Sequence, residues 1–156
     1  MIVILDFGSQ TTHLIGRRLR ELGVGVTIIT PEEYPLLKEK NIQGYILSGG
    51  PASVFEEGAP TVDKKIFQEG KPILGICYGL QLIGKFVNGE VLAGKLKEFG
   101  KKELHVKKNG KLLKGLSKKE QVWMSHGDLV AKLPKDFEVL ASTDTCPIAA
   151  FENNER

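Results

Sequence analysis

The sequence predicts an α/β fold with a doubly wound, mostly parallel central sheet, helices on both faces of that sheet, and an antiparallel strand extension in the C-terminal half. Three observations predict this fold class. Short apolar runs rich in β-branched residues alternate with helical patterns as far as residue 87. These runs are apolar throughout, as in parallel strands that are buried on both faces. Beyond residue 100, apolar and polar residues alternate, which is typical of antiparallel strands.

The first part of the chain is expected to form a strand, a helix and a second strand. Ile2–Leu5 is an apolar run that ends at Asp6, and hydroxyl side chains in residues 8–11 can start a helix. Gly23 is expected to end this helix, and residues 24–29 form the second strand. The predicted apolar face of the helix has four members: Leu14, Ile15, Leu19 and Leu22.

The middle of the chain is expected to hold the third strand between two helices. Two prolines interrupt the chain after the second strand, so only a short helix is expected there, as far as residue 40. Residues 45–47 form the third strand, which ends in a Gly-rich turn at 48–51. Pro60 starts a helix that runs to residue 69, because proline is favoured in the first helical turn. The inward side chains of that helix are Val62, Ile66 and Phe67.

A fourth strand at 73–76 leads into a helix at 78–87, after which the pattern changes. Residues 102–107 alternate, and Asn109-Gly110 predicts a hairpin turn. Three short apolar pieces then predict further strands, at 112–113, 122–124 and 139–140. We find no internal repeat and no linker, and expect a single domain over residues 1–156.

The composition of the chain argues against a membrane-spanning, secreted or metal-binding protein. The 156 residues are 41% hydrophobic and 26% charged, as in ordinary globular domains. No apolar run approaches the roughly 20 residues of a membrane-spanning helix, and the chain begins with a strand-like run instead of a secretion signal. The two cysteines have neither metal nor disulfide spacing. We therefore expect a cytoplasmic protein with no membrane partner and no metal.

The basic residues are concentrated in one stretch. Residues 95–119 contain ten lysines and only two acids, although the net charge of the chain is only +3. A solvated hairpin surface and a docking face for an acidic partner or second domain both fit this pattern. A nucleic-acid partner is not expected, because Phe99 is the only aromatic residue in this stretch and gives no stacking platform.

Residues 75–79, Gly-Ile-Cys-Tyr-Gly, place Cys77 on a sharp turn between a buried strand and a helix. The dipole at the start of a helix favours the thiolate, and the turn resembles the nucleophile elbow of hydrolases. A buried structural cysteine is the alternative. Loops at the carboxyl ends of parallel strands gather at one sheet edge, so residues 6–10, 48–51 and 75–79 are expected to meet.

Attack by a thiolate on a carbonyl needs amide donors for the oxyanion. Gly50 in the turn at 48–51 and Tyr78 after the cysteine are the natural donors; a simple tight turn or a phosphate-binding turn is the alternative at 48–51. A cysteine nucleophile also needs a base. Of the three histidines, His13 and His105 are expected to be exposed, and His126 in the polar turn 125–128 is the best candidate. No convincing Cys–His–acid set can be assembled.

Four separated motifs together resemble the class I (triad) glutamine amidotransferases. They are Gly-Ile-Cys-Tyr-Gly-Leu-Gln at 75–81, Ser-Gly-Gly-Pro at 48–51, Ile-Leu-Asp-Phe-Gly-Ser-Gln at 4–10 and Val-Trp-Met-Ser-His-Gly-Asp at 122–128. The motifs at 4–10 and 122–128, together with Ser-Gly-Gly-Pro-Ala-Ser at 48–53, are most similar to the glutaminase domains of GMP synthases. The resemblance covers the whole chain and implies a flavodoxin-like fold.

The resemblance implies a reaction and roles for six residues. Cys77 attacks the side-chain amide of L-glutamine, a γ-glutamyl thioester forms, and ammonia leaves. The amides of Gly50 and Tyr78 hold the oxyanion. Substrate binding is implied for three further residues: Gln81, Gly127 and Asp128. The family's ammonia is used by an ATP-pyrophosphatase domain, which aminates xanthosine monophosphate with ATP and Mg²⁺; no cofactor is implied for the glutaminase domain itself.

In the family, the catalytic histidine and glutamate come from a His-Pro-Glu motif, which is expected shortly after Arg156. We therefore expect the domain to be C-terminally incomplete, the ATP-pyrophosphatase domain to be supplied elsewhere, and this fragment to hydrolyse glutamine weakly or not at all. Two alternatives remain. The acceptor could instead be that of anthranilate, aminodeoxychorismate or carbamoyl phosphate synthesis, or the chain could be a non-catalytic binding module on the same fold.

Overall fold

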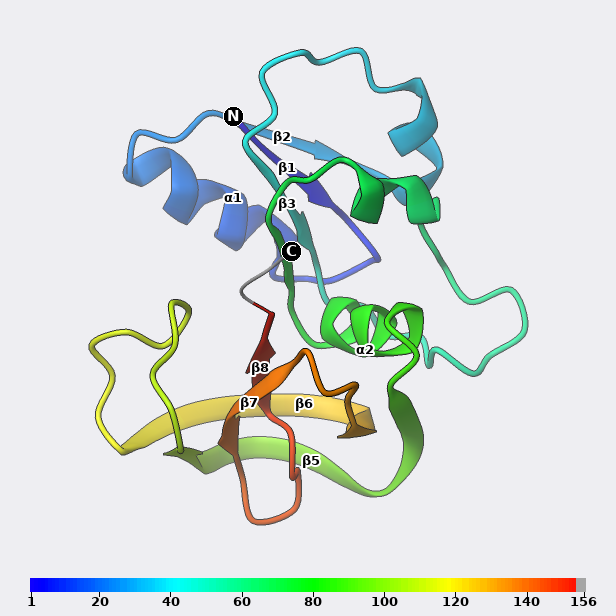
Figure 1. The fold of residues 1–156 in the computed structure, drawn as a ribbon. Coiled ribbons are helices and arrows are strands. Elements are labelled where there is room, and N and C mark those ends of the chain that lie inside the picture. Colours follow the sequence, from blue (N-terminus) through cyan, green and yellow to red (C-terminus); the bar gives the residue numbers. More distant parts are fainter. Residues whose placement is uncertain (154–156) are drawn as a thin grey trace. The chain divides into compact units, whose positions relative to one another are not determined.

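The computed structural model describes residues 1–153, except for the side chains of residues 94–97. The chain divides into two compact units, Met1–Ile83 and a second that begins at Gly84, and each is described by itself. Figure 1 shows a parallel sheet with helices in the first unit and an antiparallel sheet in the second.

The first unit contains a four-stranded parallel sheet in the order β2-β1-β3-β4. Its strands are β1 (Ile2–Leu5), β2 (Val26–Ile29), β3 (Gly44–Leu47) and β4 (Ile73–Gly75). Val3, Ile4, Leu5 and Leu47 are completely buried. This explains why the strands are continuous apolar runs without alternation. The four predicted parallel strands are therefore confirmed, with bounds that differ by at most two residues.

Two helices cover opposite faces of this sheet. A Cβ atom on Gly16 of α1 (Thr12–Glu21) would lie 3.2 Å from Cδ1 of Ile28 and 3.7 Å from Cδ1 of Ile4. Helix α2 (Tyr78–Phe86) instead packs on Leu47, whose side chain points to the other face because successive residues of a strand alternate. The doubly wound arrangement is thus confirmed (Figure 1).

The predicted apolar face of α1 is partly wrong. The buried residues of this helix are Thr12 and Gly16, whereas Leu14 and Leu22 are 58% and 77% exposed. The helix approaches β1 and β2 closely at Gly16, where a small residue fits. The larger side chains of Leu14 and Leu22 are turned outward. Gly23 has φ +77° and ends the helix as expected.

The two intermediate helices are shorter than the sequence predicts. The first, η1 (Pro31–Leu36), is a 3-10 helix started by a capping box at Thr30. The second, η2 (Lys64–Gln68), is also a 3-10 helix and begins after Asp63, whose side chain accepts a hydrogen bond from the amide of Lys65. The expected start at Pro60 is therefore wrong, because Asp63 provides the stronger cap. Val62 and Ile66 are nevertheless buried as predicted.

The second unit contains an antiparallel sheet in the order β6-β5-β7-β8. Its strands are β5 (Glu90–Val106), β6 (Lys119–Lys132), β7 (Glu138–Ser142) and β8 (Ala150–Glu152). Its small core centres on four buried residues: Leu104, Leu140, Ala141 and Ala150. The predicted strands at 122–124 and 139–140 are confirmed.

The connection between β5 and β6 is not the tight hairpin that Asn109-Gly110 suggests. Residues 107–118 form a longer loop, and residues 112–113 lie in its turns instead of in a strand. The Asn109 side chain donates hydrogen bonds to the carbonyls of Leu113 and Leu116, and Glu152 accepts hydrogen bonds from the amide of Lys111. The asparagine therefore organises the inside of the loop.

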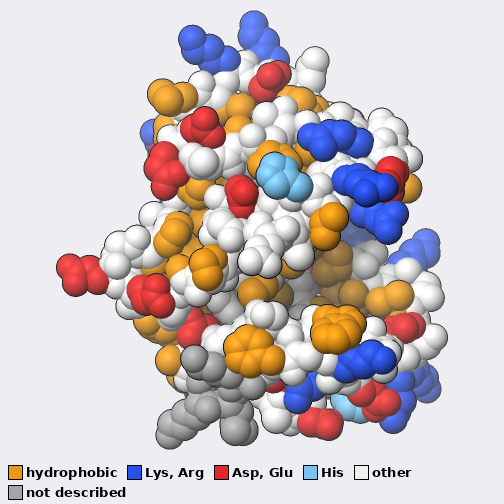
Figure 2. Space-filling model, turned by 180° about the vertical axis from the view of Figure 1, so that it is seen from behind, with side chains coloured by type: hydrophobic (Ala, Val, Ile, Leu, Met, Phe, Trp, Pro, Cys, Tyr) orange, Lys and Arg blue, Asp and Glu red, His pale blue; other side chains and the backbone are white. Residues whose placement is uncertain are grey.

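Lysine side chains in the basic stretch have acidic neighbours in the folded protein. Lys119 lies 2.8 Å from Glu103, and Lys108 pairs with Glu138. Figure 2 shows basic and acidic side chains interspersed on one face of the molecule. These exposed pairs fit the solvated-surface interpretation of the lysine-rich stretch. No helix among residues 1–153 has the length and apolar character needed to cross a bilayer.

Candidate active site

Cys77 occupies a strained position between β4 and α2. Its φ is +52°, a backbone conformation that residues other than glycine rarely adopt. Its carbonyl accepts a 3.1 Å hydrogen bond from the amide of Gln81, so Cys77 caps the first turn of α2. The thiol is partly exposed and forms no disulfide. The predicted strand–cysteine–helix turn is therefore present, and it holds the sulfur at the N-terminal end of a helix.

The two glycines that flank this turn allow the chain to pack closely. A Cβ on Gly79 would lie 2.2 Å from the carbonyl oxygen of Leu47, and one on Gly75 would lie 2.6 Å from the backbone of Gly79. Both distances are too short for a real side chain. The amide of Gly79 also donates to the carbonyl of Ser48, at 3.0 Å. The turn that carries Cys77 is thus fastened directly to the end of β3.

The three loops that the sequence places at one sheet edge do meet there. A Cβ on Gly49 would lie 3.4 Å from Cβ of Cys77 and 3.5 Å from Oγ of Ser9, so the second loop lies between the first loop and the cysteine. A Cβ on Gly50 would lie 2.4 Å from the carbonyl oxygen of Phe7. Glycine is therefore required at residue 50 by the backbone of the first loop.

Asp6 organises the first loop. Its Oδ1 accepts hydrogen bonds from the amides of Gly8 and Ser9 and from the hydroxyl of Thr12, at 2.9, 3.2 and 2.8 Å. Burial by itself would raise the pKa of Asp6, but these hydrogen bonds lower it below its ordinary value. Asp6 is therefore ionised, and its role is that of a hydrogen-bond acceptor that shapes the loop.

Ser48 joins the first loop to the second. Its side chain is completely buried. Its hydroxyl accepts a hydrogen bond from the amide of Phe7 at 3.0 Å and donates one to the carbonyl of Gly49 at 2.8 Å. Neither Asp6 nor Ser48 stands out in the sequence as a residue with a role of its own. Their position directly after β1 and β3 is the sequence signal that could have pointed to them, because functional loops gather at the carboxyl ends of parallel strands.

Tyr78 and Gln81 lie on the inner side of α2. Tyr78 is 1% exposed, its hydroxyl donates to the carbonyl of Pro60, and its ring packs on Phe7 with centroids 5.2 Å apart. Gln81 is 5% exposed, so it is not a solvent-facing helix residue. The first unit therefore brings together Gly50, Cys77, Tyr78 and Gln81 in one group of contacting segments.

Gly127 and Asp128 lie in the second unit, within strand β6. The expectation of a polar turn at 125–128 is wrong: His126 pairs with Glu98 of β5 and Asp128 pairs with Ala93. The register is irregular between Ala93 and Glu98, so Gly127 falls where the ladder is interrupted. Pairing with a long partner strand has overridden the local preference of Ser, Gly and Asp for turns.

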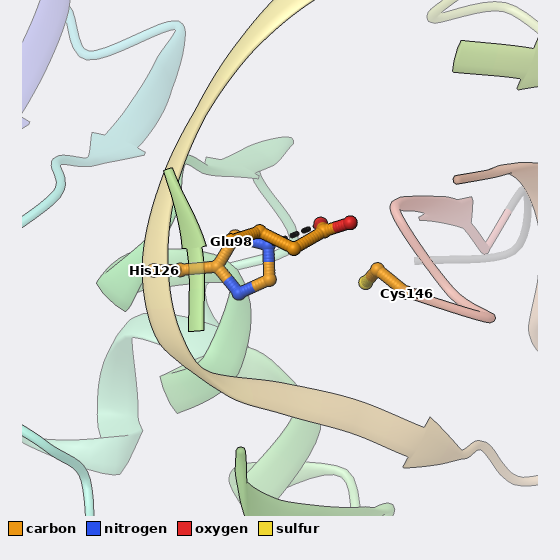
Figure 3. Close-up of side chains that lie close together, drawn as sticks. All are labelled: Glu98, His126 and Cys146. Atoms are coloured by element: carbon orange, nitrogen blue, oxygen red, sulfur yellow. Dashed lines mark hydrogen bonds and ion pairs between the residues drawn. The ribbon is translucent and has the colours of Figure 1, made fainter. Parts of the chain in front are cut away.

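A buried charged cluster surrounds His126 (Figure 3). Its Nε2 lies 3.0 Å from Oε2 of Glu98, and its Nδ1 lies 2.9 Å from the backbone carbonyl of Asp128. Glu98 is only 2% exposed, and its Oε1 accepts hydrogen bonds from the hydroxyls of Thr143, at 2.7 Å, and Thr145. Burial would raise the pKa of Glu98, but the threonine and histidine donors lower it below its ordinary value.

The cluster bears on the candidate base and on metal binding. Both ring nitrogens of His126 are already engaged in hydrogen bonds, with Glu98 and with the carbonyl of Asp128, so neither is available to a thiol. Among the described residues, Glu98, His126 and Cys146 form the one group of three that could hold a metal ion, with ligand atoms within 4.8 Å. Cys146 donates to the carbonyl of Ile148, and burial followed by the charge of Glu98 raises its pKa to about 11. The three groups are thus already engaged in hydrogen bonds, and the Cys146 thiol is neutral.

Of the other two histidines, only His13 is as exposed as the sequence predicts, whereas His105 is partly buried. His13 is exposed on α1, and His105 is 35% exposed on β5, near Asp144 and Glu103. Glu98 is the residue that sequence reasoning missed altogether. Its partners His126, Thr143 and Thr145 are distant along the chain, and its lysine-rich surroundings suggested a solvent-exposed acid.

Comparisons with known proteins identify relatives of the chain. Residues 3–156 match the family model of "Glutamine amidotransferase class-I". The GMP synthases [glutamine-hydrolyzing] of Caldicellulosiruptor saccharolyticus and Aquifex aeolicus are 51% and 48% identical to it over 158 residues each. These alignments cover 100% and 99% of this chain but only 31% of each relative. The chain therefore spans about a third of the length of these curated relatives.

Solved structures agree with the sequence comparisons. A GMP synthase subunit protein from Thermoplasma acidophilum superposes with a TM-score of 0.88 at 36% identity, covering 99% of this chain and 78% of that one. A glutamine amidotransferase of Thermotoga maritima shares the fold, with a TM-score of 0.79 at 18% identity and coverage of 99% and 71%. The chain belongs to the class I glutamine amidotransferase family.

Proposed function

We propose that this chain is the glutaminase portion of a GMP synthase, in which Cys77 attacks the side-chain amide of L-glutamine. The observation that carries the proposal is the left-handed backbone of Cys77, with φ +52°, between β4 and α2. Such strain persists only where the surrounding structure enforces it, and it is typical of functional sites. Family membership and the names of the relatives support the same reaction.

The chemistry follows from the segments around Cys77. Attack forms a bond between sulfur and the amide carbon, and the carbonyl oxygen becomes an oxyanion that the amides of Gly50 and Tyr78 stabilise. Collapse breaks the carbon–nitrogen bond, ammonia leaves with a proton, and a γ-glutamyl thioester remains for water to hydrolyse. We assign these proton transfers to the histidine and glutamate of the family's His-Pro-Glu motif. The contact of Gly49 with Cys77 supports Gly50 as a donor.

Three further residues are assigned to substrate binding. Gln81 lies one turn beyond Cys77 on α2 and is buried, which suits a side chain that contacts substrate instead of solvent. The backbone at Gly127 and Asp128 is assigned to the amino-acid head group of glutamine. The interruption of the β5–β6 ladder at Gly127 supports this role, because backbone groups outside a ladder can bind a ligand.

The ammonia is proposed to serve a separate ATP-pyrophosphatase domain or subunit in the cytoplasm. That partner, with ATP and Mg²⁺, would adenylate xanthosine monophosphate and aminate it to GMP. No cofactor is assigned to this chain. Supporting this, the relatives are named GMP synthase [glutamine-hydrolyzing] and extend well beyond the matched region.

The nucleophile is tested by labelling with a diazo-ketone analogue of L-glutamine followed by peptide mass spectrometry. We expect one adduct, on Cys77, and protection by excess L-glutamine but not by D-glutamine. Cys146→Ser should be labelled like the wild type, because that thiol is buried and neutral. Cys77→Ser should remain unlabelled. An adduct on Cys146, or labelling of Cys77 that L-glutamine does not slow, would refute the assignment.

The acceptor is tested with a chimera. The chain replaces the matching 158-residue region of the C. saccharolyticus relative, to which it is 51% identical. We expect this chimera to make GMP from xanthosine monophosphate, ATP and glutamine. The same chimera with Cys77→Ser should make GMP only when ammonium is supplied. A chimera with intact Cys77 that uses ammonium but never glutamine would count against the proposal.

A further inference from the structure

The segment of β6 around Gly127 has no regular ladder to set its shape. Ladder pairing joins Glu98 to His126 and Ala93 to Asp128, so one residue of β6 faces a longer stretch of β5. In such an irregular region the strand bends and backbone groups lose their cross-strand partners. Other contacts must then fix the conformation of Gly127.

His126 supplies one such contact by folding back over Gly127. Its Nδ1 donates to the carbonyl of Asp128 at 2.9 Å, which ties residue 126 to residue 128 across the glycine. Its Nε2 donates to Oε2 of Glu98 at 3.0 Å. Both ring nitrogens are therefore engaged in hydrogen bonds, one on each side of the imidazole. The ring is held almost out of solvent, with 11% of its side chain exposed.

Glu98 in turn is fixed by groups from a different part of the unit. Thr143 and Thr145 donate to its Oε1, while its Oε2 faces His126, so both oxygens of the carboxylate are held by side chains of the second unit. The turn that holds them is closed by hydrogen bonds between Thr143 and Cys146. A continuous chain of hydrogen bonds therefore runs from this turn through Glu98 and His126 to the backbone of Asp128.

We propose that Glu98 and His126 form a buried positioning pair that holds the backbone of Gly127 and Asp128 in the geometry that binds the α-amino-acid head group of glutamine. This inference rests on the proposed function. Neither side chain takes part in the reaction. They act through the backbone of β6, whose groups bind the head group well only if they are fixed beforehand.

The test measures inactivation of Cys77 by the diazo-ketone glutamine analogue over a range of reagent concentrations. This yields the half-saturating concentration and the maximal rate separately. Iodoacetamide is the matched control reagent, because it alkylates the same thiol but has no amino-acid head group. Two variants separate the two hydrogen bonds of the ring: the amide nitrogen of Asn can replace Nδ1, and that of Gln can replace Nε2.

We expect His126→Gln to raise the half-saturating concentration of the analogue about tenfold, or about 1.4 kcal/mol, with the maximal rate and the iodoacetamide rate unchanged. The half-saturating concentration for His126→Asn should be closer to that of the wild type, because Asn retains a donor for the carbonyl of Asp128. Thr145→Val, which removes one donor to Glu98, should shift the same constant in the same direction and is the milder variant if the others fail to fold.

Several results would overturn the inference. One is a half-saturating concentration equal to that of the wild type in folded His126→Gln. Another is His126→Gln being closer to the wild type than His126→Asn, which would mean that only the ion pair to Glu98 matters. An equal loss of Cys77 reactivity toward the analogue and toward iodoacetamide would show that the substitution disturbs the thiol in general and not the binding of the head group. If the wild type itself is not labelled at Cys77 with protection by glutamine, the proposed function fails instead.

Discussion

A Cβ atom on Gly79 would lie 2.2 Å from the carbonyl oxygen of Leu47, so the first turn of α2 rests directly on the backbone of β3. The amide of Gly79 reinforces this contact by donating to the carbonyl of the next residue, Ser48. The position of Cys77 is thus set by backbone-to-backbone packing, which cannot adjust as a flexible side chain can. The nucleophile is held on rigid elements, as an attacking group requires.

Gly79→Ala should destabilise the first unit strongly. The added methyl group meets backbone, so helix or strand must shift, and overpacking of this kind costs about 3 kcal/mol. Gly25→Ala is the matched control, because the nearest atom to its new Cβ would be 3.8 Å away. Urea unfolding of both variants measures the difference. Equal stability of the two variants would contradict the packing described here.

The strain at Cys77 predicts an unusual order of stability. Cys77→Gly should be about 1 kcal/mol more stable than Cys77→Ala, because glycine adopts a positive φ without steric cost. The order should reverse at the other cysteine. Cys146 has no positive φ and is buried, so Cys146→Gly should be less stable than Cys146→Ala. Thermal unfolding of the four variants checks both orders, and the same order at both positions would contradict the assigned strain.

The parts of the fold that the sequence predicts well are those in which local pattern and tertiary environment agree. Residues 2–5 and 44–47 are apolar throughout because both faces of the parallel sheet are covered. The Gly-Ile-Cys-Tyr-Gly turn is recognisable because its two glycines are required by contacts within a few residues of Cys77 and with β3. Local sequence carries enough information in both cases.

The remaining features depend on partners that are distant in the sequence. Residues 125–128 have turn-forming side chains, yet pairing with β5 makes them part of a strand. The sequence neighbours of Glu98 predict a solvated lysine-rich surface, and only the fold places His126 and Thr143 beside it. Leu14 fits a helical apolar stripe, but the close approach at Gly16 turns it outward. No residue-by-residue pattern contains these contacts.

The two tyrosines bound to Glu69 should resist ionisation in alkali. Tyr34 and Tyr45 donate to the two oxygens of that carboxylate, at 2.5 and 2.6 Å. Burial, followed by Glu69, raises the pKa of both well above the ordinary value of 10. The unfolded chain ionises these groups near pH 10, so their contribution to stability is complete below that pH and is lost as the pH rises above it.

Ultraviolet absorbance titration measures this directly. At a pH about one unit above 10, the native protein should contain fewer phenolates than the urea-unfolded protein. Tyr34→Phe and Tyr45→Phe should each remove part of the delayed titration. Glu69→Gln should allow earlier ionisation of both tyrosines, because it removes the negative charge. Native and unfolded curves that coincide would show that the cluster does not form.

The Glu98–His126 pair makes the second unit sensitive to acid. Because the pKa of Glu98 is lowered in the folded state, its stabilising contribution is complete above the ordinary pKa near 4.5 and is lost as the pH falls through the folded value. Glu98→Gln removes a buried carboxylate that accepts hydrogen bonds from His126, Thr143 and Thr145, and should cost about 3 kcal/mol at pH 7. The difference in free energy of unfolding between wild type and variant should therefore shrink as the pH is lowered below the ordinary pKa near 4.5. Urea unfolding from pH 7 to pH 3 measures the difference, with Glu103→Gln, which removes exposed contacts to Lys119 and His105, as the control that changes stability least. A difference between wild type and Glu98→Gln that stays constant with pH would mean that the carboxylate is not charged in the folded protein, and the hydrogen-bond chain to Asp128 would then need a different donor arrangement.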